Sequence, residues 1–126
     1  MAVIGIGLDV VESTRAKALL ERHGERIMAR VLTEEEAGYV RSLADPVPAF
    51  AARLAAKEAV YKALQVLPGA RAVGWREIGV HRLPDGRPEI VLTGHAQELL
   101  SPHRVQIHIS ISHSHDVAAA VAILEG

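Results

Sequence analysis

The sequence predicts an α+β fold in which a long central helix packs on a largely antiparallel sheet. Two observations indicate this class: helical patterns fill the first half of the chain, and alternating or β-branched runs fill the second. A length of 126 residues suits a single domain, 1–126, with one core. Alanine, valine, leucine and isoleucine dominate the apolar residues and only four are aromatic, so the expected core is thin and oligomerisation is a reasonable expectation.

The first half of the chain reads as one strand followed by helices. Residues 2–11 (AVIGIGLDVV) have the β-branched character of a strand, and Gly5 and Gly7 predict a bulge or the close approach of another backbone. Ser13 is the expected N-cap of a helix over 14–24, which Gly24 ends. The TEEE segment at 33–36 has capping-box spacing and predicts a second helix to about Leu43.

A third, central helix is expected over residues 50–64 (FAARLAAKEAVYKAL), after a break at ADPVPA and before Pro68-Gly69. In the second half, residues 75–83 and 88–93 predict two strands joined by a turn at PDGR. Residues 94–103 suggest a short helix, and 104–115 alternate apolar with polar residues as a half-buried strand does. Residues 116–126 are apolar throughout, which predicts a strand covered on both faces.

Composition excludes several classes of function. The net charge of −1 argues against broad electrostatic capture of nucleic acid. The absence of cysteine excludes disulfides, iron–sulfur clusters and thiolate catalysis. The N-terminal segment has no basic region and reaches Asp9 too early for a signal peptide or membrane span. We therefore expect a cytoplasmic protein with no nucleic-acid or membrane partner.

Polar residues gather on one half of the central helix, where a 100° step places Arg53, Lys57, Glu58, Tyr61, Lys62 and Gln65. Glu58 precedes Lys62 in the order that favours an ion pair, whereas Arg53 and Lys57 repel each other unless an anion lies between them. This half of the helix is either an ordinary solvated face or part of a phosphate-and-metal site.

Asp9 lies near the end of an apolar strand, where its carboxylate must be exposed or paired, because burial without a partner is costly. It has either a capping role before the next helix or a role in a site. Together, Asp9 and Glu58 offer the two hard oxygen ligands that proteins supply to Mg²⁺ bound with substrate phosphates. Their separation in sequence does not show that they meet in space.

Hydroxyl and imidazole groups end the strand 104–115. Ser112, His113 and Ser114 can bind a phosphate or ribose, or form a simple turn, and Arg87 at the hairpin tip can reach an anion. A catalytic triad of Ser112, His113 and Asp116 is disfavoured, because neighbours along a chain rarely point at one another correctly. A zinc site from the histidines at 108, 113 and 115 is disfavoured because alternation puts the first on the opposite face from the others.

Four segments, in this order, resemble the bacterial holo-acyl-carrier-protein synthases, the small phosphopantetheinyl transferases: GIGLDVVES, RVLTEEE, FAARLAAKEAVYKAL and SISHS…AAAVAI. The turn DGRP also matches that family, and the match spans nearly the whole chain. The resemblance implies transfer of the phosphopantetheine arm of coenzyme A to a serine of apo acyl carrier protein in fatty-acid biosynthesis, with release of adenosine 3′,5′-bisphosphate.

The resemblance also implies roles for individual residues. Asp9 and Glu58 would bind Mg²⁺ with the coenzyme A pyrophosphate, and Lys62 would hold a phosphate oxygen, so these three form the expected catalytic set. Arg53 and Lys57 would add positive charge at the same site. The general base stays open among Glu58, Asp9 and a water on the metal.

The nucleotide, the partner and the assembly follow from the same resemblance. The segment Ser112, His113 and Ser114 would lie near the adenosine 3′-phosphate, and the turn Gly86, Arg87 and Pro88 would flank the nucleotide. The protein would be a homotrimer with sites at subunit interfaces. Arg15 would dock the acidic carrier. Independently of the resemblance, the charge of Arg22 and Arg26 suggests that they extend this basic patch.

The chain departs from the family in places. Leu54 and Val60 stand where phenylalanine is common, and the loop 45–49 is short and proline-rich, so family contacts made there do not carry over. Two alternatives use the same residues: a Mg²⁺-dependent phosphohydrolase acting on a nucleotide pyrophosphate, and a non-catalytic module that binds coenzyme A or carrier proteins.

Overall fold

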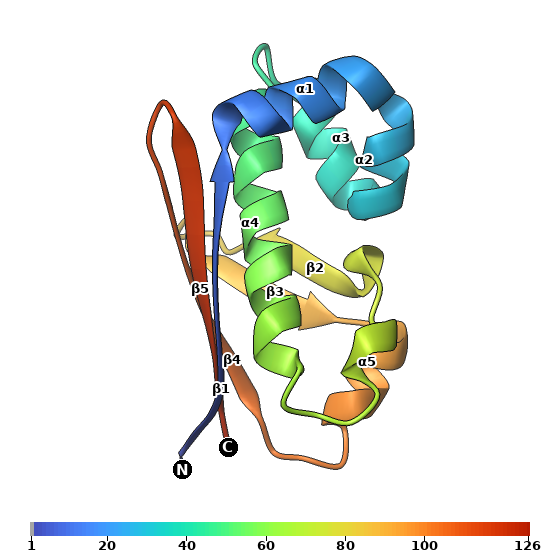
Figure 1. The fold of residues 1–126 in the computed structure, drawn as a ribbon, viewed down its shortest axis with the longest axis vertical. Helices are drawn as coiled ribbons and strands as arrows, with labels where there is room; N and C mark the ends of the chain where they lie inside the picture. Colours follow the sequence, from blue (N-terminus) through green and yellow to red (C-terminus); the bar gives the residue numbers. More distant parts are fainter. Residues whose placement is uncertain (1) are drawn as a thin grey trace.

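The computed structural model, which describes residues 2–126, begins with a long strand and a group of helices (Figure 1). Strand β1 (Val3–Glu12) leads into α1 (Ser13–His23), α2 (Glu25–Val31) and α3 (Glu34–Ser42), and the central helix α4 (Val47–Leu64) follows. Two short 3-10 turns, η1 (Ala70–Ala72) and η2 (Trp75–Glu77), precede β2 (Ile78–Arg82) and β3 (Pro88–Leu92). Helix α5 (Gly94–Leu100) and strands β4 (Gln106–His113) and β5 (Val117–Glu125) complete the chain.

The strands form two antiparallel sheets rather than one. The larger sheet has the order β1-β5-β4, and β2 pairs with β3 in a separate hairpin. Figure 1 shows the larger sheet on one side of α4 and the other helices and the hairpin around its remaining sides. This confirms the predicted α+β class with a central helix on antiparallel strands.

Glycines let α4 lie directly on β1. A Cβ atom added to Gly7 would lie 1.8 Å from the carbonyl oxygen of Ala59, and one added to Gly5 would lie 2.5 Å from that of Ala63. The pairing of β1 with β5 also shifts register between Val3 and Gly5. Both readings of the interrupted strand, a bulge and a close backbone approach, are therefore confirmed.

The capping box at the start of α3 is also confirmed. The Thr33 hydroxyl accepts a hydrogen bond from the Glu36 amide at 3.2 Å, and the Glu36 side chain accepts one from the Thr33 amide at 2.8 Å. Gly24 ends α1 at φ 48°, as expected. The prediction that Ser13 caps α1 is wrong, because Glu12 holds the N-cap position and Ser13 is the first helical residue. The Ser13 hydroxyl donates to the His115 carbonyl at 2.9 Å.

Three further expectations need correction. Helix α4 begins at Val47 instead of 50, because proline is tolerated in a first helical turn, as Pro48 is here. Strand β2 begins only at Ile78, and the separate helix α2 was not expected at all. Strand β5 is buried on one face only: Ala118, Ala120, Ala122 and Leu124 pack inward, while the residues between them stay partly accessible.

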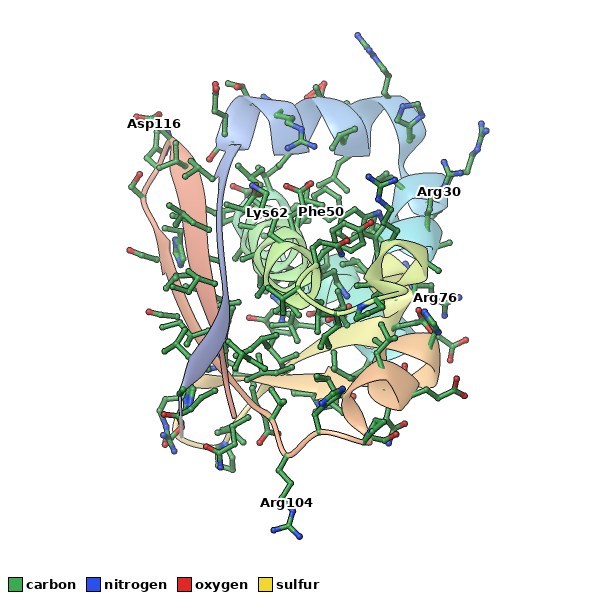
Figure 2. The ribbon with its side chains drawn as sticks, turned by 60° about the horizontal axis from the view of Figure 1, so that its bottom comes forward. Arg30, Phe50, Lys62, Arg76, Arg104 and Asp116 are labelled. Atoms are coloured by element: carbon green, nitrogen blue, oxygen red, sulfur yellow. The ribbon has the colours of Figure 1, made fainter. Side chains whose placement is uncertain are left out.

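The core surrounds α4 on most of its circumference. Ten of its residues are buried, including Phe50, which Figure 2 shows inside the molecule while Arg30 and Arg104 project from the surface. The opposite face of the larger sheet leaves apolar side chains exposed on β1, namely Ile4, Ile6, Leu8 and Val10. No helix in the described part of the chain is long and apolar enough to cross a membrane.

Candidate functional site

Two acidic side chains, Asp9 on β1 and Glu58 on α4, face each other at one edge of the sheet. Their side chains are only 11% and 18% exposed. The Lys62 ammonium, one helical turn from Glu58, donates to Asp9 Oδ1 and to the Leu8 carbonyl, both at 2.9 Å. Arg15 on α1 approaches Glu58 Oε1 at 3.5 Å. The structure therefore brings together the predicted catalytic set and the predicted carrier-docking arginine.

The neighbouring cations and hydrogen-bond donors do not fully satisfy the two carboxyl groups of this acidic pair. Burial, and then the neighbouring Asp9 carboxyl group, raise the pKa of Glu58 to about 7, while Arg15 acts in the opposite direction. Asp9 Oδ2 is buried and has no hydrogen-bond partner among the described residues. Two close carboxylates with an unpartnered oxygen fit a hard divalent cation, which would favour the ionised form of Glu58.

The two carboxylates suit a cation that takes most of its ligands from substrate and water rather than from the protein. Within residues 2–126, no group of three or more acidic or histidine side chains is arranged to hold a metal ion. Magnesium commonly takes one or two carboxylates, and substrate phosphates and water complete its octahedron. His108 and His113 lie on opposite faces of β4, as the alternation along this strand predicts.

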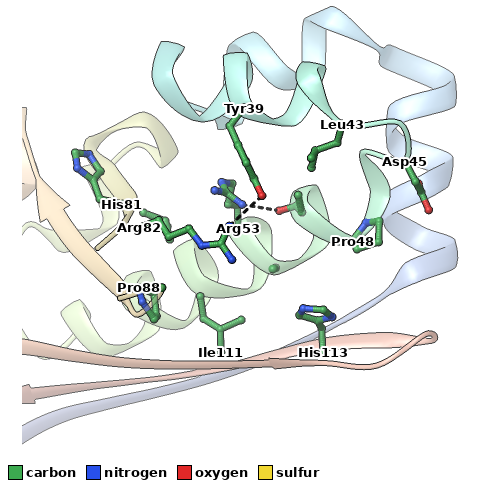
Figure 3. Close-up of a pocket in the computed structure, with 14 residues that line it drawn as sticks. Tyr39, Leu43, Asp45, Pro48, Arg53, His81, Arg82, Pro88, Ile111 and His113 are labelled. Atoms are coloured by element: carbon green, nitrogen blue, oxygen red, sulfur yellow. Dashed lines mark hydrogen bonds between the residues drawn. The ribbon is translucent and has the colours of Figure 1, made fainter. Parts of the chain in front are cut away.

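A second feature, which we call the anion pocket, lies on the other side of α4 (Figure 3). It encloses about 330 Å³ between α3, α4, β2, the hairpin turn and β4. Three residues predicted to lie near the nucleotide line it: Gly86, Pro88 and His113. Arg53, which was expected beside the acidic pair, lines this pocket instead. The structure adds Tyr39, His81 and Arg82, which the sequence did not single out because their contribution depends on how α3 and β2 pack.

The cations of the anion pocket are held in place but not neutralised. The Arg53 guanidinium lies 4.8 Å from the centre of the Tyr39 ring, and its Nη1 donates to the Ala49 carbonyl at 3.3 Å. The Tyr39 hydroxyl accepts a hydrogen bond from Arg82 Nη1 at 3.2 Å. Burial lowers the pKa of Arg53, and its buried Nε–H has no partner in the described chain. Among the lining residues only Asp45 is acidic, so the pocket suits an anion such as phosphate.

Lys57 does not belong to this site, contrary to the sequence-based assignment. Its side chain is fully buried and forms an ion pair with Glu36 at 2.8 Å. It also donates to the carbonyls of Trp75 at 3.0 Å and Ile78 at 2.6 Å, so all three of its donors are used. Burial lowers the pKa of Lys57 and Glu36 opposes that effect. The half of α4 that looked polar in the sequence is thus divided between two sites and the core.

The remaining predicted residues are spread around the β4 end. Ser112 pairs with Ala119 on the opposite face of the sheet from His113. The Ser114 hydroxyl accepts a weak hydrogen bond from the Asp116 amide at 3.4 Å, and Ser114 lines an adjoining, larger groove. Arg87 is exposed and donates to Asp85 at 2.7 Å, at the edge of the anion pocket rather than inside it.

The acidic pair and the anion pocket lie at opposite edges of the larger sheet. Ala120 on the middle strand β5 pairs with Asp9 of the acidic pair on β1 and with Ile111 of the anion pocket on β4. Arg53 and Glu58 project about 140° apart around α4. A single chain therefore holds two separate candidate sites.

Comparison with known proteins identifies the family of the chain. Residues 5–122 match the family model described as the 4′-phosphopantetheinyl transferase superfamily. The chain is 39% identical over 123 residues to a holo-[acyl-carrier-protein] synthase of Chlamydia pneumoniae, with 98% of each chain covered. It is 41% identical over 124 residues to one of Maridesulfovibrio salexigens, again with 98% of each covered.

Solved structures agree with the sequence relatives. A holo-[acyl-carrier-protein] synthase from Neisseria meningitidis superposes with a TM-score of 0.84 at 28% identity, covering 99% of this chain and 100% of that one. One from Bacillus anthracis, in complex with CoA (3′,5′-ADP), superposes with a TM-score of 0.79 at 31% identity, covering 98% and 96%. The chain therefore belongs to the holo-acyl-carrier-protein synthase family of 4′-phosphopantetheinyl transferases.

Proposed function

We propose that this chain transfers the phosphopantetheine arm of coenzyme A to a serine of apo acyl carrier protein, with Mg²⁺ held by Asp9 and Glu58. The phosphoanhydride bond of coenzyme A breaks, a phosphoester forms on the serine oxygen, and the serine proton is lost. The observation that carries this proposal is the pair of close carboxylates with an unpartnered oxygen, beside the Lys62 ammonium.

The residues of the acidic pair have separate tasks in this reaction. Asp9 and Glu58 hold the cation, which when bound neutralises pyrophosphate oxygens and makes the anhydride a better electrophile. Lys62 is 55% exposed and already bonded to Asp9, so its ammonium stands at the rim of the acidic pair, where it contacts an incoming phosphate oxygen.

The anion pocket holds the leaving group. Adenosine 3′,5′-bisphosphate carries phosphates at two positions, and Arg53, Arg82 and His113 supply donors for them. The turn Gly86, Arg87 and Pro88 flanks the nucleotide. Holding the pyrophosphate at the acidic pair and the nucleotide in the anion pocket orients the anhydride for in-line attack.

A complete site requires more than one copy of the chain. The acidic pair lies at the β1 edge and the anion pocket near the β4 edge, so a rotational assembly that places these edges together unites them. The exposed apolar side chains on β1, with Ile6 64% and Leu8 61% exposed, supply a surface that such contacts would bury. We propose the homotrimer on this basis.

The carrier protein docks on α1 in this proposal. Arg15 lies 3.5 Å from Glu58, so an acidic partner that engages Arg15 places its serine next to the acidic pair. Arg22 and Arg26 are exposed and extend the positive surface. A cytoplasmic location and a role in fatty-acid biosynthesis remain predictions from the sequence resemblance.

The test is to incubate the protein with coenzyme A, Mg²⁺ and apo acyl carrier protein, and to weigh the carrier by intact mass spectrometry. We expect a gain equal to phosphopantetheine that excess chelator prevents and that added Mg²⁺ restores. Glu58→Gln, which keeps the side-chain shape, should nearly abolish the gain, whereas Glu98→Gln on the exposed face of α5 should leave it unchanged.

Two other outcomes would replace the proposal. Free phosphopantetheine released in the absence of carrier would indicate a phosphohydrolase. Tight binding of coenzyme A, indifferent to Mg²⁺ and without turnover on several carriers, would indicate a binding module.

A further inference from the structure

The buried ion pair of Lys57 and Glu36 has no direct part in the proposed reaction, yet it occupies the centre of the molecule. The two side chains are 0% and 2% exposed. Glu36 accepts from Lys57 and from the amides of Thr33 at 2.8 Å and Val80 at 2.6 Å. Lys57 donates its remaining hydrogens to two backbone carbonyls. Every polar group of the pair is therefore satisfied.

The pair ties together three elements, and each element carries one of the three pocket residues Tyr39, Arg53 and Arg82. Tyr39 follows Glu36 by three residues on α3, and Arg53 precedes Lys57 by four on α4, so each lies about one helical turn away. On β2, Arg82 lies two residues beyond Val80 and thus on the same face of that strand.

These three pocket residues also contact one another. The Tyr39 ring stacks under Arg53, and its hydroxyl accepts from Arg82. A cavity of about 120 Å³ is lined by Glu36 and Val80 together with all three pocket residues, so it borders both Glu36 of the ion pair and the anion pocket. A small shift of α3 or β2 relative to α4 would therefore separate the two guanidinium groups.

Stability alone is a poor explanation for the pair. Removing two charges from water is so costly that well-packed apolar residues often serve a fold equally well or better. A rigid, directional junction between three elements is what an ion pair with five hydrogen bonds adds beyond simple packing.

We propose that the Lys57–Glu36 pair is a positioning element that sets the arrangement of Tyr39, Arg53 and Arg82 for binding a phosphate of coenzyme A. This inference rests on the proposed function, because it takes the anion pocket to be the nucleotide half of the site. Lys57 and Glu36 act through these three residues and do not themselves contact the ligand.

The test uses the double variant Lys57→Met/Glu36→Gln, which removes both charges and keeps nearly the same side-chain volume. Binding of adenosine 3′,5′-bisphosphate is measured by calorimetry, and KM and kcat are measured for coenzyme A. We expect affinity for the bisphosphate to fall by about tenfold or more, the equivalent of one lost charge-assisted hydrogen bond. The KM for coenzyme A should rise in parallel, with kcat at saturation within about twofold of wild type.

A matched control separates positioning from general loosening of the core. Leu124→Ala removes a fully buried side chain on the sheet side of α4, far from the pocket, and should lower the unfolding temperature without changing bisphosphate affinity. Should the double variant not fold, the neutral pair Lys57→Gln/Glu36→Gln, which keeps hydrogen-bonding groups at both positions, carries the same affinity prediction.

The outcomes discriminate clearly. Wild-type affinity in the folded double variant, or an equal loss in Leu124→Ala, would overturn the positioning role while leaving the proposed function intact. Failure of wild-type protein to bind either coenzyme A or the bisphosphate would refute both the nucleotide assignment of the pocket and the positioning role.

Discussion

Replacing Glu58 by glutamine should make the metal-free protein more stable at alkaline pH, although it should destroy the active site. The pKa of Glu58 is raised from its ordinary 4.5 to about 7, chiefly by burial and then by Asp9. A carboxyl group whose pKa is raised by folding favours the folded state fully below pH 4.5. This contribution is lost as the pH rises through 7.

The size of the effect follows from the same shift. Each tenfold change in acidity corresponds to about 1.4 kcal/mol, so the full linkage would be ~3 kcal/mol. Solvent reaches the Glu58 side chain, which is 18% exposed, and screening reduces the expected effect to about 1–2 kcal/mol. Glutamine at this position stays neutral and avoids the whole penalty. The long, half-exposed contact with Arg15 is worth too little to reverse the sign.

The assay is urea unfolding followed by circular dichroism at pH 4.5 and pH 8.5, in the presence of a chelator. We expect the free energy of unfolding of Glu58→Gln to exceed that of wild type by about 1–2 kcal/mol at the higher pH and to equal it at the lower pH. The control Glu98→Gln should follow wild type at both. Saturating Mg²⁺ at pH 8.5 should stabilise wild type but not Glu58→Gln. A Glu58→Gln protein that is no more stable than wild type at pH 8.5 would refute the account of this acidic pair.

Three further predictions test other parts of the structure. Gly7→Ala should lower the free energy of unfolding in urea by about 3 kcal/mol or more, because its Cβ would overlap the Ala59 carbonyl oxygen. The control Gly38→Ala, whose Cβ would lie in open space, should not destabilise the fold. Equal stabilities of the two variants would contradict the close packing of α4 on β1. Arg15→Glu should raise the KM for the carrier protein more than that for coenzyme A, and an unchanged carrier KM would remove Arg15 from the docking surface. Ile6→Lys should convert the proposed trimer to monomer in light scattering, and a persistent trimer would exclude the exposed β1 face from the interface.

Local signals in the sequence were sufficient for most of the secondary structure. The capping box at Thr33 and Glu36, the stop at Gly24 and the alternation along β4 each depend on neighbours within a few residues. Such patterns can be recognised in the sequence because helix caps and strand faces depend on the geometry of nearby residues. Errors occurred where short-range rules are permissive, as at the start of α4, where proline fits either a break or a first turn.

The candidate metal ligands could also be predicted from the sequence, because Asp9 and Glu58 are the residue types that a hard cation needs. That these two side chains lie close together could not be predicted, because it depends on Gly5 and Gly7 letting α4 lie against β1. The sequence grouped Lys57 with Arg53 and Glu58 on one half of a helical wheel, and that grouping mixed three environments. A wheel records angles about one helix, but only the packed neighbours decide which angle faces metal, nucleotide or core.

The sequence by itself therefore determined the family, the order of helices and strands, and the chemistry of the acidic pair. Tertiary structure alone decided that Lys57 is buried against Glu36, that Tyr39 and Arg82 join Arg53, and that the acidic pair and the anion pocket lie at opposite sheet edges. The physical reason is that burial and charge pairing arise between segments distant in the chain. Their energies depend on distances that no local pattern encodes.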